Sequence, residues 1–277
     1  MSHELPLSPR SLRPDALLRE IGRLQNDRGY RDSRRRFFIE GVRNVVQAIG
    51  NGFDVEALLY SDRLLTVPIA RQLVRRQRRA GTPTLQVAPE VFRRVSKTLR
   101  ASGVGAIVKQ HWSPLKTVSP ADGLCWIVLE AVRSEGNLGT LIRSSEAVGG
   151  AGFILVGPGV DPFHPGVVRA SMGALFSQRL VRTTYPALAG WLQTHAVPVV
   201  GASPDGSTDL HELNDRRPAL VVLGEERAGL SAPQRRLCTS LVRIPMTGSA
   251  DSLNVAVAGS LLMYEVYRAQ SRPKEPG

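Results

Sequence analysis

Short apolar runs alternate with helix-like segments throughout the second half of this chain of 277 residues. The runs predict strands at Leu124–Leu129, Phe153–Val156, Leu180–Arg182, Val197–Gly201, Ala219–Leu223 and Leu241–Ile244. The segments between them predict helices at Leu138–Val148, Pro165–Phe176, Tyr185–His195, Ala232–Leu237 and Val255–Ala269. Apolar strands that alternate with helices are typical of parallel sheets buried on both faces. The sequence therefore predicts an α/β fold with a mostly parallel sheet, covered by helices on both faces, for residues 124–270.

Polar, glycine-containing segments follow several of these strands. In such sheets the loops that leave the carboxyl ends of the strands carry the site. Three segments are candidates: Asn137–Arg143, Gly224–Gly229 and Ile244–Asn254. Taken singly, each is explained about as well by helix caps and tight turns. The sequence contains neither the G-x-G-x-x-G spacing of a dinucleotide site nor a G-x-x-x-x-G-K-[ST] loop, which disfavours those kinds of nucleotide site.

The positive charge is confined to the first part of the chain. Residues 1–120 carry 22 Lys and Arg against 10 Asp and Glu, whereas residues 121–277 carry 14 of each. The net charge of +12 is therefore a property of the first part, as expected of a region that meets a polyanion such as RNA. Within it, the arginine-rich segment Arg31–Arg36 is interpreted as a phosphate contact, with a solvated loop as the alternative.

Alternating strands and helices also predict a small domain before the parallel sheet. Helices are expected at Pro14–Gln25, Val42–Ile49 and Ile69–Arg79, and strands at Val55–Tyr60, Thr84–Val87 and Val104–Gln110. The predicted division is a tail over residues 1–13, a basic α/β domain over 14–111, a proline-containing linker over 112–123, the parallel-sheet domain over 124–270 and a tail over 271–277.

Composition excludes several classes of protein. Cys125 and Cys238 lie far apart, and the five histidines form no pair at helical spacing, so no metal site is expected. The amino terminus lacks the apolar region of a signal peptide, and no apolar run approaches the roughly 18 residues of a membrane span. We therefore expect a cytoplasmic protein without a membrane partner.

Taken together and in order, the three segments resemble the motifs of SpoU-type RNA 2′-O-ribose methyltransferases of the SPOUT class. The motifs are N-x-G-x-x-x-R from Asn137, L-G-x-E-x-x-G-L from Leu223, and I-P-M-x-G followed by S-L-N-V-A-x-A from Ile244. The F-x-x-E-G-x-x-x-V pattern at Phe37–Val45 is similar to the start of the ribosomal-protein-like substrate-binding domain common in that family. Size and arginine content resemble those of actinobacterial 23S rRNA methyltransferases that confer avilamycin or thiostrepton resistance.

This resemblance implies S-adenosylmethionine as cofactor, a trefoil knot in the second domain and a homodimer. It places the cofactor against Ala202, Ser203, Leu223, Gly224, Ile244, Met246 and Leu253. It places Asn137, Arg143, Glu226, Ser252 and Asn254 at the reacting centre. The implied reaction is methylation of a ribose 2′-hydroxyl, with 23S rRNA as substrate and tRNA as the alternative. A non-catalytic RNA-binding protein and a nicotinamide enzyme are the rival interpretations.

The reaction requires that a ribose hydroxyl be aligned and lose its proton, because it is protonated at neutral pH. The proposal for the family makes Arg143 the base, assisted by an RNA phosphate. A guanidinium has a pKa above about 12, so a second interpretation is that Arg143 clamps the phosphate while Glu226 or a phosphate oxygen takes the proton. Glu225 adds a second carboxylate beside Glu226, and the motif register favours Glu226 as the one that faces the site.

Overall fold

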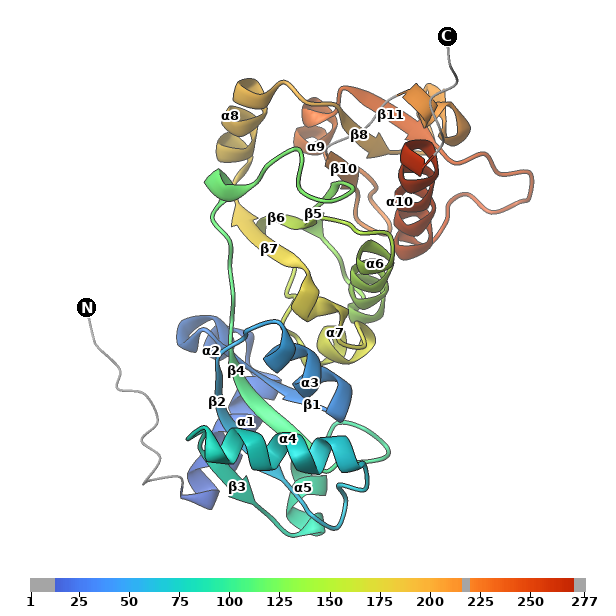
Figure 1. The fold of residues 1–277 in the computed structure, drawn as a ribbon. Coiled ribbons are helices and arrows are strands. Elements are labelled where there is room, and N and C mark those ends of the chain that lie inside the picture. Colours follow the sequence, from blue (N-terminus) through green and yellow to red (C-terminus); the bar gives the residue numbers. More distant parts are fainter. Residues whose placement is uncertain (1–12, 216–219, 272–277) are drawn as a thin grey trace. The chain divides into compact units, whose positions relative to one another are not determined.

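The computed structural model describes residues 13–215 and 220–271, so most of the two predicted tails lies outside the described residues. Contacts between residues divide the chain into two compact units. The amino-terminal unit runs up to His111 and also contains Pro162–Ser177. The carboxy-terminal unit contains Trp112–Asp161 and the chain from Gln178 onward. Each unit has a sheet of its own, drawn in Figure 1.

Four strands form the sheet of the amino-terminal unit, in the order β1 (Arg36–Glu40), β4 (Val104–Lys109), β2 (Val55–Tyr60) and β3 (Thr84–Gln86). Strand β4 is antiparallel to both β1 and β2, and β3 is parallel to β2. The helices are α1 (Pro14–Asn26), α2 (Arg28–Arg34), α3 (Val42–Gly50), α4 (Pro68–Arg79) and α5 (Pro89–Val95). Buried apolar side chains of α1, α5 and the sheet form one core, which includes Ile21, Leu24, Phe38, Leu59 and Phe92.

A distant segment completes this unit. Helix α7 (Pro165–Ala170) and the 3-10 helix η2 (Ala174–Ser177) belong to it, although they follow β6 of the other unit in sequence. The ring of Phe37 lies 4.6 Å from that of Phe163 and 6.3 Å from that of Phe176, measured between centroids. Aromatic pairs at such distances stabilise a core beyond the area they bury. The unit therefore departs from the predicted boundary at residue 111, because its aromatic core draws in residues 162–177.

The carboxy-terminal sheet has seven strands and is parallel throughout. Their order is β7 (Arg179–Thr183), β6 (Gly152–Gly159), β5 (Trp126–Ala131), β10 (Leu220–Leu223), β8 (Val199–Ala202), β11 (Ser240–Arg243) and β9 (Thr208–Asp209). Every neighbouring pair is parallel. The helices are α6 (Glu135–Ala147), α8 (Tyr185–His195), α9 (Ala232–Leu237) and α10 (Val255–Ser271), with 3-10 helices η1 (Leu115–Thr117) and η3 (Leu210–Asp215). The predicted parallel α/β fold is confirmed.

Helices cover both faces of this sheet because successive strand side chains point to opposite sides. On one face Trp126 and Val128 of β5 pack with Leu188 of α8. On the other face α6 and α10 contact one another and lie side by side in Figure 1. Gly259 of α10 permits this approach, since a Cβ there would lie 2.5 Å from the Leu141 side chain. The start of α10 is thereby held next to the start of α6, where the predicted site residues lie.

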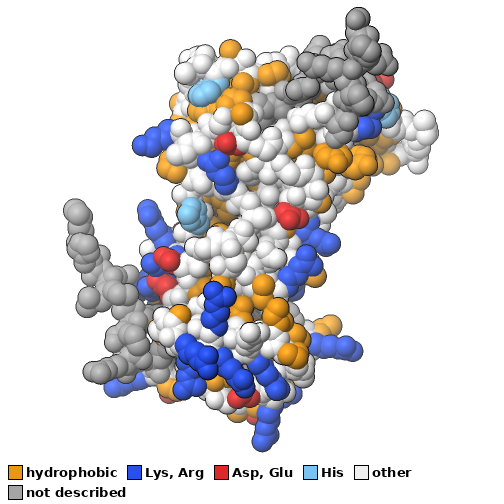
Figure 2. Space-filling model, viewed as in Figure 1, with side chains coloured by type: hydrophobic (Ala, Val, Ile, Leu, Met, Phe, Trp, Pro, Cys, Tyr) orange, Lys and Arg blue, Asp and Glu red, His pale blue; other side chains and the backbone are white. Residues whose placement is uncertain are grey.

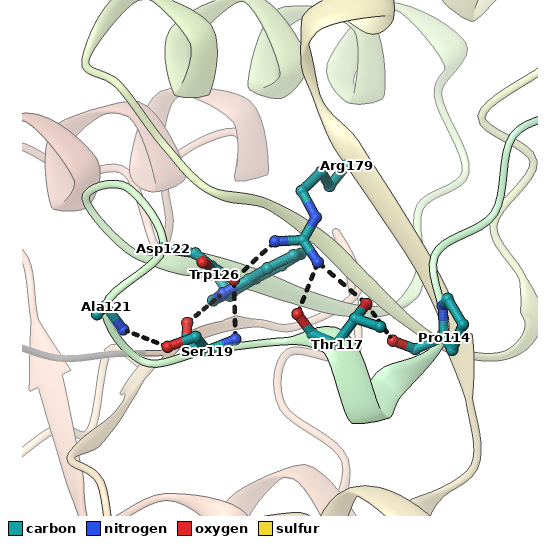
Figure 3. A network of polar contacts seen from close by, with 7 residues as sticks. All are labelled: Pro114, Thr117, Ser119, Ala121, Asp122, Trp126 and Arg179. Atoms are coloured by element: carbon teal, nitrogen blue, oxygen red, sulfur yellow. Dashed lines mark hydrogen bonds and ion pairs between the residues drawn. The ribbon is translucent and has the colours of Figure 1, made fainter.

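The predicted linker is anchored to the carboxy-terminal unit by a polar network (Figure 3). The guanidinium of Arg179 donates to the Asp122 carboxylate at 2.7 Å and to the Thr117 carbonyl at 2.8 Å. The indole N–H of Trp126 donates to the Ser119 carbonyl at 3.1 Å, and the Arg179 guanidinium lies over the same indole ring. Residues 112–123 are therefore part of this unit, and the change of unit occurs between His111 and Trp112.

One predicted helix is interrupted. Pro165–Phe176 splits into α7 and η2 because Met172 and Gly173 adopt φ values of 52° and 93°, in the left-handed region. A glycine adopts this conformation readily, but the apolar spacing of the segment did not reveal the break. Strand β1 and helices α2 and α5 were not predicted as separate elements. Among the described residues, no helix has both the length and the apolar character needed to cross a membrane.

Candidate active site

A cavity of about 420 Å³ lies at the carboxyl ends of β8, β10 and β11 and beside the start of α10. All seven residues predicted to contact the cofactor line it: Ala202, Ser203, Leu223, Gly224, Ile244, Met246 and Leu253. This volume falls within the range of about 300–1,000 Å³ that is typical of small-molecule sites. Its walls combine apolar side chains with strand-end backbone, and we call it the strand-end cavity.

The loop that follows β10 forms one wall of this cavity. Its ends are joined by hydrogen bonds from the Glu225 N–H to the Gly229 carbonyl, at 3.0 Å, and from the Gly229 N–H to the Glu225 carbonyl, at 2.9 Å. Gly229 has a φ of 67°, and a Cβ on Gly224 would collide with the Gly229 backbone. Both glycines are therefore needed for the tight turn, which presents Glu225 and Glu226 in succession.

A chain of side-chain hydrogen bonds joins three of the predicted catalytic residues. The Asn254 amide donates to the Asn137 side-chain oxygen at 2.9 Å, and the Asn137 amide donates to a Glu226 carboxylate oxygen at 3.1 Å. We call these residues the Asn–Glu–Asn cluster. They come from the loop before α10, the first turn of α6 and the loop after β10, far apart in sequence. Glu226 also lines the strand-end cavity, so the cluster borders it.

Helix caps explain part of this cluster. Asn254 caps α10, because its side-chain oxygen accepts from the N–H groups of Ala256, at 2.8 Å, and Val257, at 3.3 Å. Its capping role and its contact with Asn137 use different atoms, so the cap leaves the amide of Asn254 free to join the cluster. Asn137, in contrast, does not cap α6. Ser134 is the capping residue, and its hydroxyl accepts from the Asn137 N–H at 3.4 Å.

Glu226 is held as a carboxylate. It accepts hydrogen bonds from the backbone N–H groups of Arg133, at 3.1 Å, and Ser134, at 3.2 Å, as well as from Asn137. Burial raises the pKa of Glu226, but these donors and its own backbone N–H outweigh burial and leave the pKa below its ordinary value. A carboxylate with a lowered pKa is a weak base, and its hydrogen bonds fix the loop that enters α6.

The neighbouring carboxylate, that of Glu225, has different partners. Glu225 forms an ion pair with the guanidinium of Arg133 and accepts from the Ala228 N–H at 3.1 Å. Its side chain is only 14% exposed. The two carboxylates are thus divided between partners, and Glu226 is the one that reaches Asn137. The motif register favoured Glu226 over Glu225 as the carboxylate that faces the site, and these contacts agree with that preference.

The SpoU rRNA Methylase family matches residues 125–264, and the MRM3-like substrate binding domain matches residues 16–106. A 23S rRNA (uridine(2479)-2′-O)-methyltransferase of Streptomyces viridochromogenes is 31% identical over 270 residues, which cover 95% of this chain and 93% of that protein. This chain belongs to the SpoU rRNA methylase family.

Solved structures of SpoU family members and other rRNA methyltransferases have the same fold. An AdoMet-bound rRNA methyltransferase from Sinorhizobium meliloti matches with a TM-score of 0.83 and 32% identity, over 95% of this chain and 97% of that one. The AdoMet complex of the SpoU methyltransferase AviRb from Streptomyces viridochromogenes matches with a TM-score of 0.83 and 31% identity, over 92% and 98% of the two chains. The likeness therefore extends over both units of this SpoU protein.

Two predicted catalytic residues of this SpoU protein lie outside the cluster. Ser252 is exposed and lines the strand-end cavity. Arg143 is exposed on α6 and lines no part of that cavity. Six residues of α-helix place it roughly 9 Å along the axis from Asn137 and about 120° around it. Within the described residues Arg143 makes no hydrogen bond or ion pair, so its guanidinium is available to a ligand.

Sequence reasoning missed a charged pair at the edge of the strand-end cavity. Asp205 and Arg235 both line it, and the Arg235 guanidinium donates to Asp205 at 3.1 Å and to the Ser203 hydroxyl at 3.1 Å. The hydrogen bond from Arg235, aided by that from Ser203, lowers the pKa of Asp205 to about 2. Arg235 lies in α9, outside every motif, and only its place in the fold brings it to the site. No group of His, Cys, Asp and Glu in the part that the structure describes is arranged to hold a metal ion.

Proposed function

We propose that this protein methylates a ribose 2′-hydroxyl in RNA with S-adenosylmethionine as the methyl donor, and that its substrate is 23S rRNA. The observation that carries the proposal is the position of the Asn–Glu–Asn cluster, which borders the strand-end cavity through Glu226. Family membership supports the same reaction, and a relative with this activity is 31% identical over 95% of the chain.

The strand-end cavity suits the proposed cofactor. Leu223, Ile244 and Leu253 provide apolar walls, and the carboxyl ends of three parallel strands provide backbone N–H and carbonyl groups. When bound, S-adenosylmethionine supplies an electrophilic methyl group. The two similar crystal structures contain the same cofactor, which supports this assignment.

The cluster orients the ribose rather than removing its proton. The oxygens of Glu226 already accept several hydrogen bonds, and its lowered pKa makes it a poor proton acceptor. Arg143 is also a poor acceptor, because its guanidinium stays protonated. We therefore assign Arg143 to an RNA phosphate and neither side chain to the role of base, and the hydroxyl proton passes to solvent water as the methyl group is transferred. Asn137 and Asn254 hold the loop against which the ribose lies.

The amino-terminal unit provides the affinity for RNA. Helix α4 carries Arg75, Arg76, Arg78 and Arg79, all exposed, and none of them pairs with an acidic group in the part of the chain that is described. Figure 2 shows Lys and Arg side chains gathered on this unit. Unpaired arginines on one helix form a surface for phosphates. We propose that residues 14–111 bind RNA, in line with the match to a substrate binding domain.

We further propose that two copies of the chain associate through α10. Val257, Leu261, Tyr264 and Tyr267 are spaced to share one face of this helix, and they are 47%, 41%, 60% and 43% exposed. Large apolar side chains gathered on one helix face favour burial against a partner. Light scattering coupled to gel filtration should give the mass of a dimer for the protein and of a monomer for Leu261→Asp. A monomeric wild-type protein at micromolar concentration would contradict this proposal.

We also propose that the carboxy-terminal unit contains a trefoil knot. Strand β10 inserts between β5 and β8 although it follows both in sequence, and β11 then pairs with the other side of β8. This order supports a chain that passes through its own earlier turns. Unfolding and refolding of the carboxy-terminal unit should then be slow, since threading must accompany folding. Refolding in milliseconds, followed by fluorescence, would speak against a knot.

Mapping of the methylated position tests the reaction directly. Purified 23S rRNA, assembled large subunits and tRNA would be incubated with the protein and labelled S-adenosylmethionine, and linkages resistant to alkali would be mapped. A single resistant linkage in 23S rRNA is expected, because a 2′-O-methyl group blocks backbone cleavage. Label in tRNA alone would change the substrate, and absence of label from all three would reject the reaction.

We propose that the protein methylates rRNA in the cytoplasm. The methyl group would make the ribosome resistant to an antibiotic that binds there. Cells that express the protein should tolerate more avilamycin or thiostrepton than cells that express Asn137→Ala. Equal inhibitory concentrations for the two strains would leave the methyl group without this role.

A further inference from the structure

A second cavity, of about 740 Å³, adjoins the strand-end cavity. Glu225, Ala228 and Gly229 line both cavities, so the loop after β10 is the wall between them. Its remaining walls come from the carboxyl ends of β5, β6 and β7 and the starts of α8 and α9. All of these elements belong to the carboxy-terminal unit. None of the sequence motifs falls on β6, β7 or α8. The cofactor is assigned to the strand-end cavity, so the second cavity is left for another ligand.

A polar group is built into one side of this second cavity. The Tyr185 hydroxyl donates to a Glu130 carboxylate oxygen at 2.7 Å and lies 3.3 Å from the Ser231 hydroxyl. Burial and the nearby Glu130 raise the pKa of Tyr185 to about 12, so the phenol stays protonated. Within the described residues, the other oxygen of Glu130 accepts no hydrogen bond. The cavity thus presents acceptors to a ligand that carries N–H donors.

Glycines and prolines line another part of the second cavity. Gly157, Pro158 and Gly159 line it together with Pro186. Gly157 has a φ of 74° and no atom within 4 Å of the place where a Cβ would be, so the cavity is not filled there. Unstacked RNA bases stack on aromatic side chains. The tyrosine ring and the glycine–proline segment therefore suit a planar ligand.

The position of this cavity defines which planar ligand fits. Arg133 lines it, while the backbone N–H of the same residue donates to Glu226 of the cluster. A ribose at the cluster carries its base on the carbon next to the one that bears the 2′-hydroxyl. The base must therefore occupy space within a few ångströms of Glu226. The cavity behind the shared wall of Glu225, Ala228 and Gly229 provides that space.

We propose that this second cavity binds the base of the nucleotide whose ribose is methylated, with Glu130 as the hydrogen-bond acceptor for its N–H groups and Tyr185 as its stacking and positioning partner. This assignment rests on the proposed function and adds to it a subsite for an unpaired base. It implies that the target nucleotide leaves its helical stack before methyl transfer. It also makes Glu130 a determinant of which base is accepted.

Two variants test the subsite. Glu130→Gln and Tyr185→Phe should each lower kcat/KM for the mapped RNA by about tenfold to a hundredfold, as expected when a buried polar group is left without its partner. The dissociation constant for S-adenosylmethionine, measured by calorimetry, should change less than about twofold, which also shows that the variants fold. Tyr60→Phe is the matched control, because Tyr60 donates a similar hydrogen bond, to Gln86 at 3.1 Å, in the other unit.

A modified RNA separates this subsite from a structural role of the same residues. The mapped nucleotide would be replaced by an abasic ribonucleotide, which keeps the 2′-hydroxyl, and a second RNA would be abasic at the 3′ neighbour. The wild-type protein should lose kcat/KM on the first RNA and keep it on the second. Glu130→Gln should then be no slower than wild type on the first RNA, because the group that Glu130 contacts has gone.

Three results would overturn the assignment. Glu130→Gln could be equally impaired on normal and abasic RNA, which would make its role structural. The loss could follow the 3′ neighbour, which would place a different base in the cavity. A wild-type protein that binds S-adenosylmethionine but methylates no RNA would reject the proposed function, and the subsite with it. Loss on the first abasic RNA, without further loss in Glu130→Gln, would support the assignment.

Discussion

Arginine is used differently on helix α4 of the amino-terminal unit and around the sheet of the carboxy-terminal unit. On α4 of the amino-terminal unit, four exposed arginines have no acidic partner among the described residues. In the carboxy-terminal unit most arginines near the sheet are matched with carboxylates. The ion pairs are Arg133 with Glu225, Arg179 with Asp122, Arg235 with Asp205, Arg243 with Asp209 and Arg268 with Glu265. Unpaired arginines leave charge for a polyanion, whereas paired ones orient loops and helices.

Among the residues that the structure describes, Arg143 in the carboxy-terminal unit is unpaired as well, like Arg227 and Arg236, and it is the one that the motifs place at the reacting centre. It belongs to the neutral unit but remains exposed and without a partner within the described residues. Every other predicted catalytic residue either belongs to the Asn–Glu–Asn cluster or lines the strand-end cavity. The cluster is thus held by contacts within the protein, whereas Arg143 and the arginines of α4 leave positive charge for RNA phosphates.

The largest effect is expected from replacing Asn137, which contacts both other residues of the Asn–Glu–Asn cluster. Asn137→Ala breaks the contacts to both Glu226 and Asn254, so methyl transfer should fall by about a hundredfold or more, as for other groups that pre-organise a site. RNA affinity should be unchanged, because the basic surface is elsewhere. Single-turnover methylation and filter binding measure the two quantities. Gln193→Ala, at an exposed position of α8, is the control, and equal loss of both quantities would break the contrast.

A second variant tests the role of Arg143. Arg143→Lys keeps the charge but loses the planar fork that binds phosphate, and we expect methyl transfer to fall by roughly tenfold to a hundredfold. Calorimetry should find almost unaltered S-adenosylmethionine binding. Arg236→Lys makes the same exchange at an exposed position of α9. Full turnover by Arg143→Lys would remove Arg143 both from the phosphate clamp and from any role as base.

The basic surface should affect binding rather than chemistry. Replacing Arg75, Arg76, Arg78 and Arg79 by Ala should weaken RNA binding by about tenfold or more at moderate salt and reduce the slope of log affinity against log salt by up to about 3. The rate at saturating RNA should stay unchanged. The double variant Arg243→Ala with Arg268→Ala removes arginines that are paired in the other unit. A slope that falls equally per arginine in both variants would erase the distinction between the units.

The smallest effect concerns pH. The folded-state pKa of Glu226 lies below its ordinary value, so the stability that its ionised form contributes is fully present above the unfolded-state pKa. That contribution is lost only as the pH falls through the lower folded-state pKa. The gap in unfolding midpoint between wild type and Glu226→Gln should therefore be constant from about pH 8 to pH 5 and narrow in more acidic solution. A gap that narrows between pH 8 and pH 6 would contradict the lowered pKa.

Some residues were misjudged because their surroundings are non-local. Arg31–Arg36 was interpreted as a phosphate contact, yet Arg31 is 2% exposed and donates to the Leu24 carbonyl at 2.8 Å, while Arg36 pairs with Glu56. A run of arginines signals charge but carries no information on which guanidinium is buried. Residues 162–177 were predicted in the second domain, but contacts group them with the amino-terminal unit, since Phe163 packs against Phe37, more than a hundred positions earlier.

The sequence by itself determined the parallel α/β fold, because periodic apolar runs act over a few residues. The resemblance of its motifs to those of the family indicated the residues that line the strand-end cavity. Ordered motifs identified Asn137, Glu226 and Asn254 without showing that they touch. Only the tertiary structure decided that Ser134 rather than Asn137 caps α6 and that Glu226 rather than Glu225 meets Asn137. It also placed Arg143 outside the cluster and opened the second cavity. These outcomes depend on how strands distant in sequence align, which no local pattern encodes.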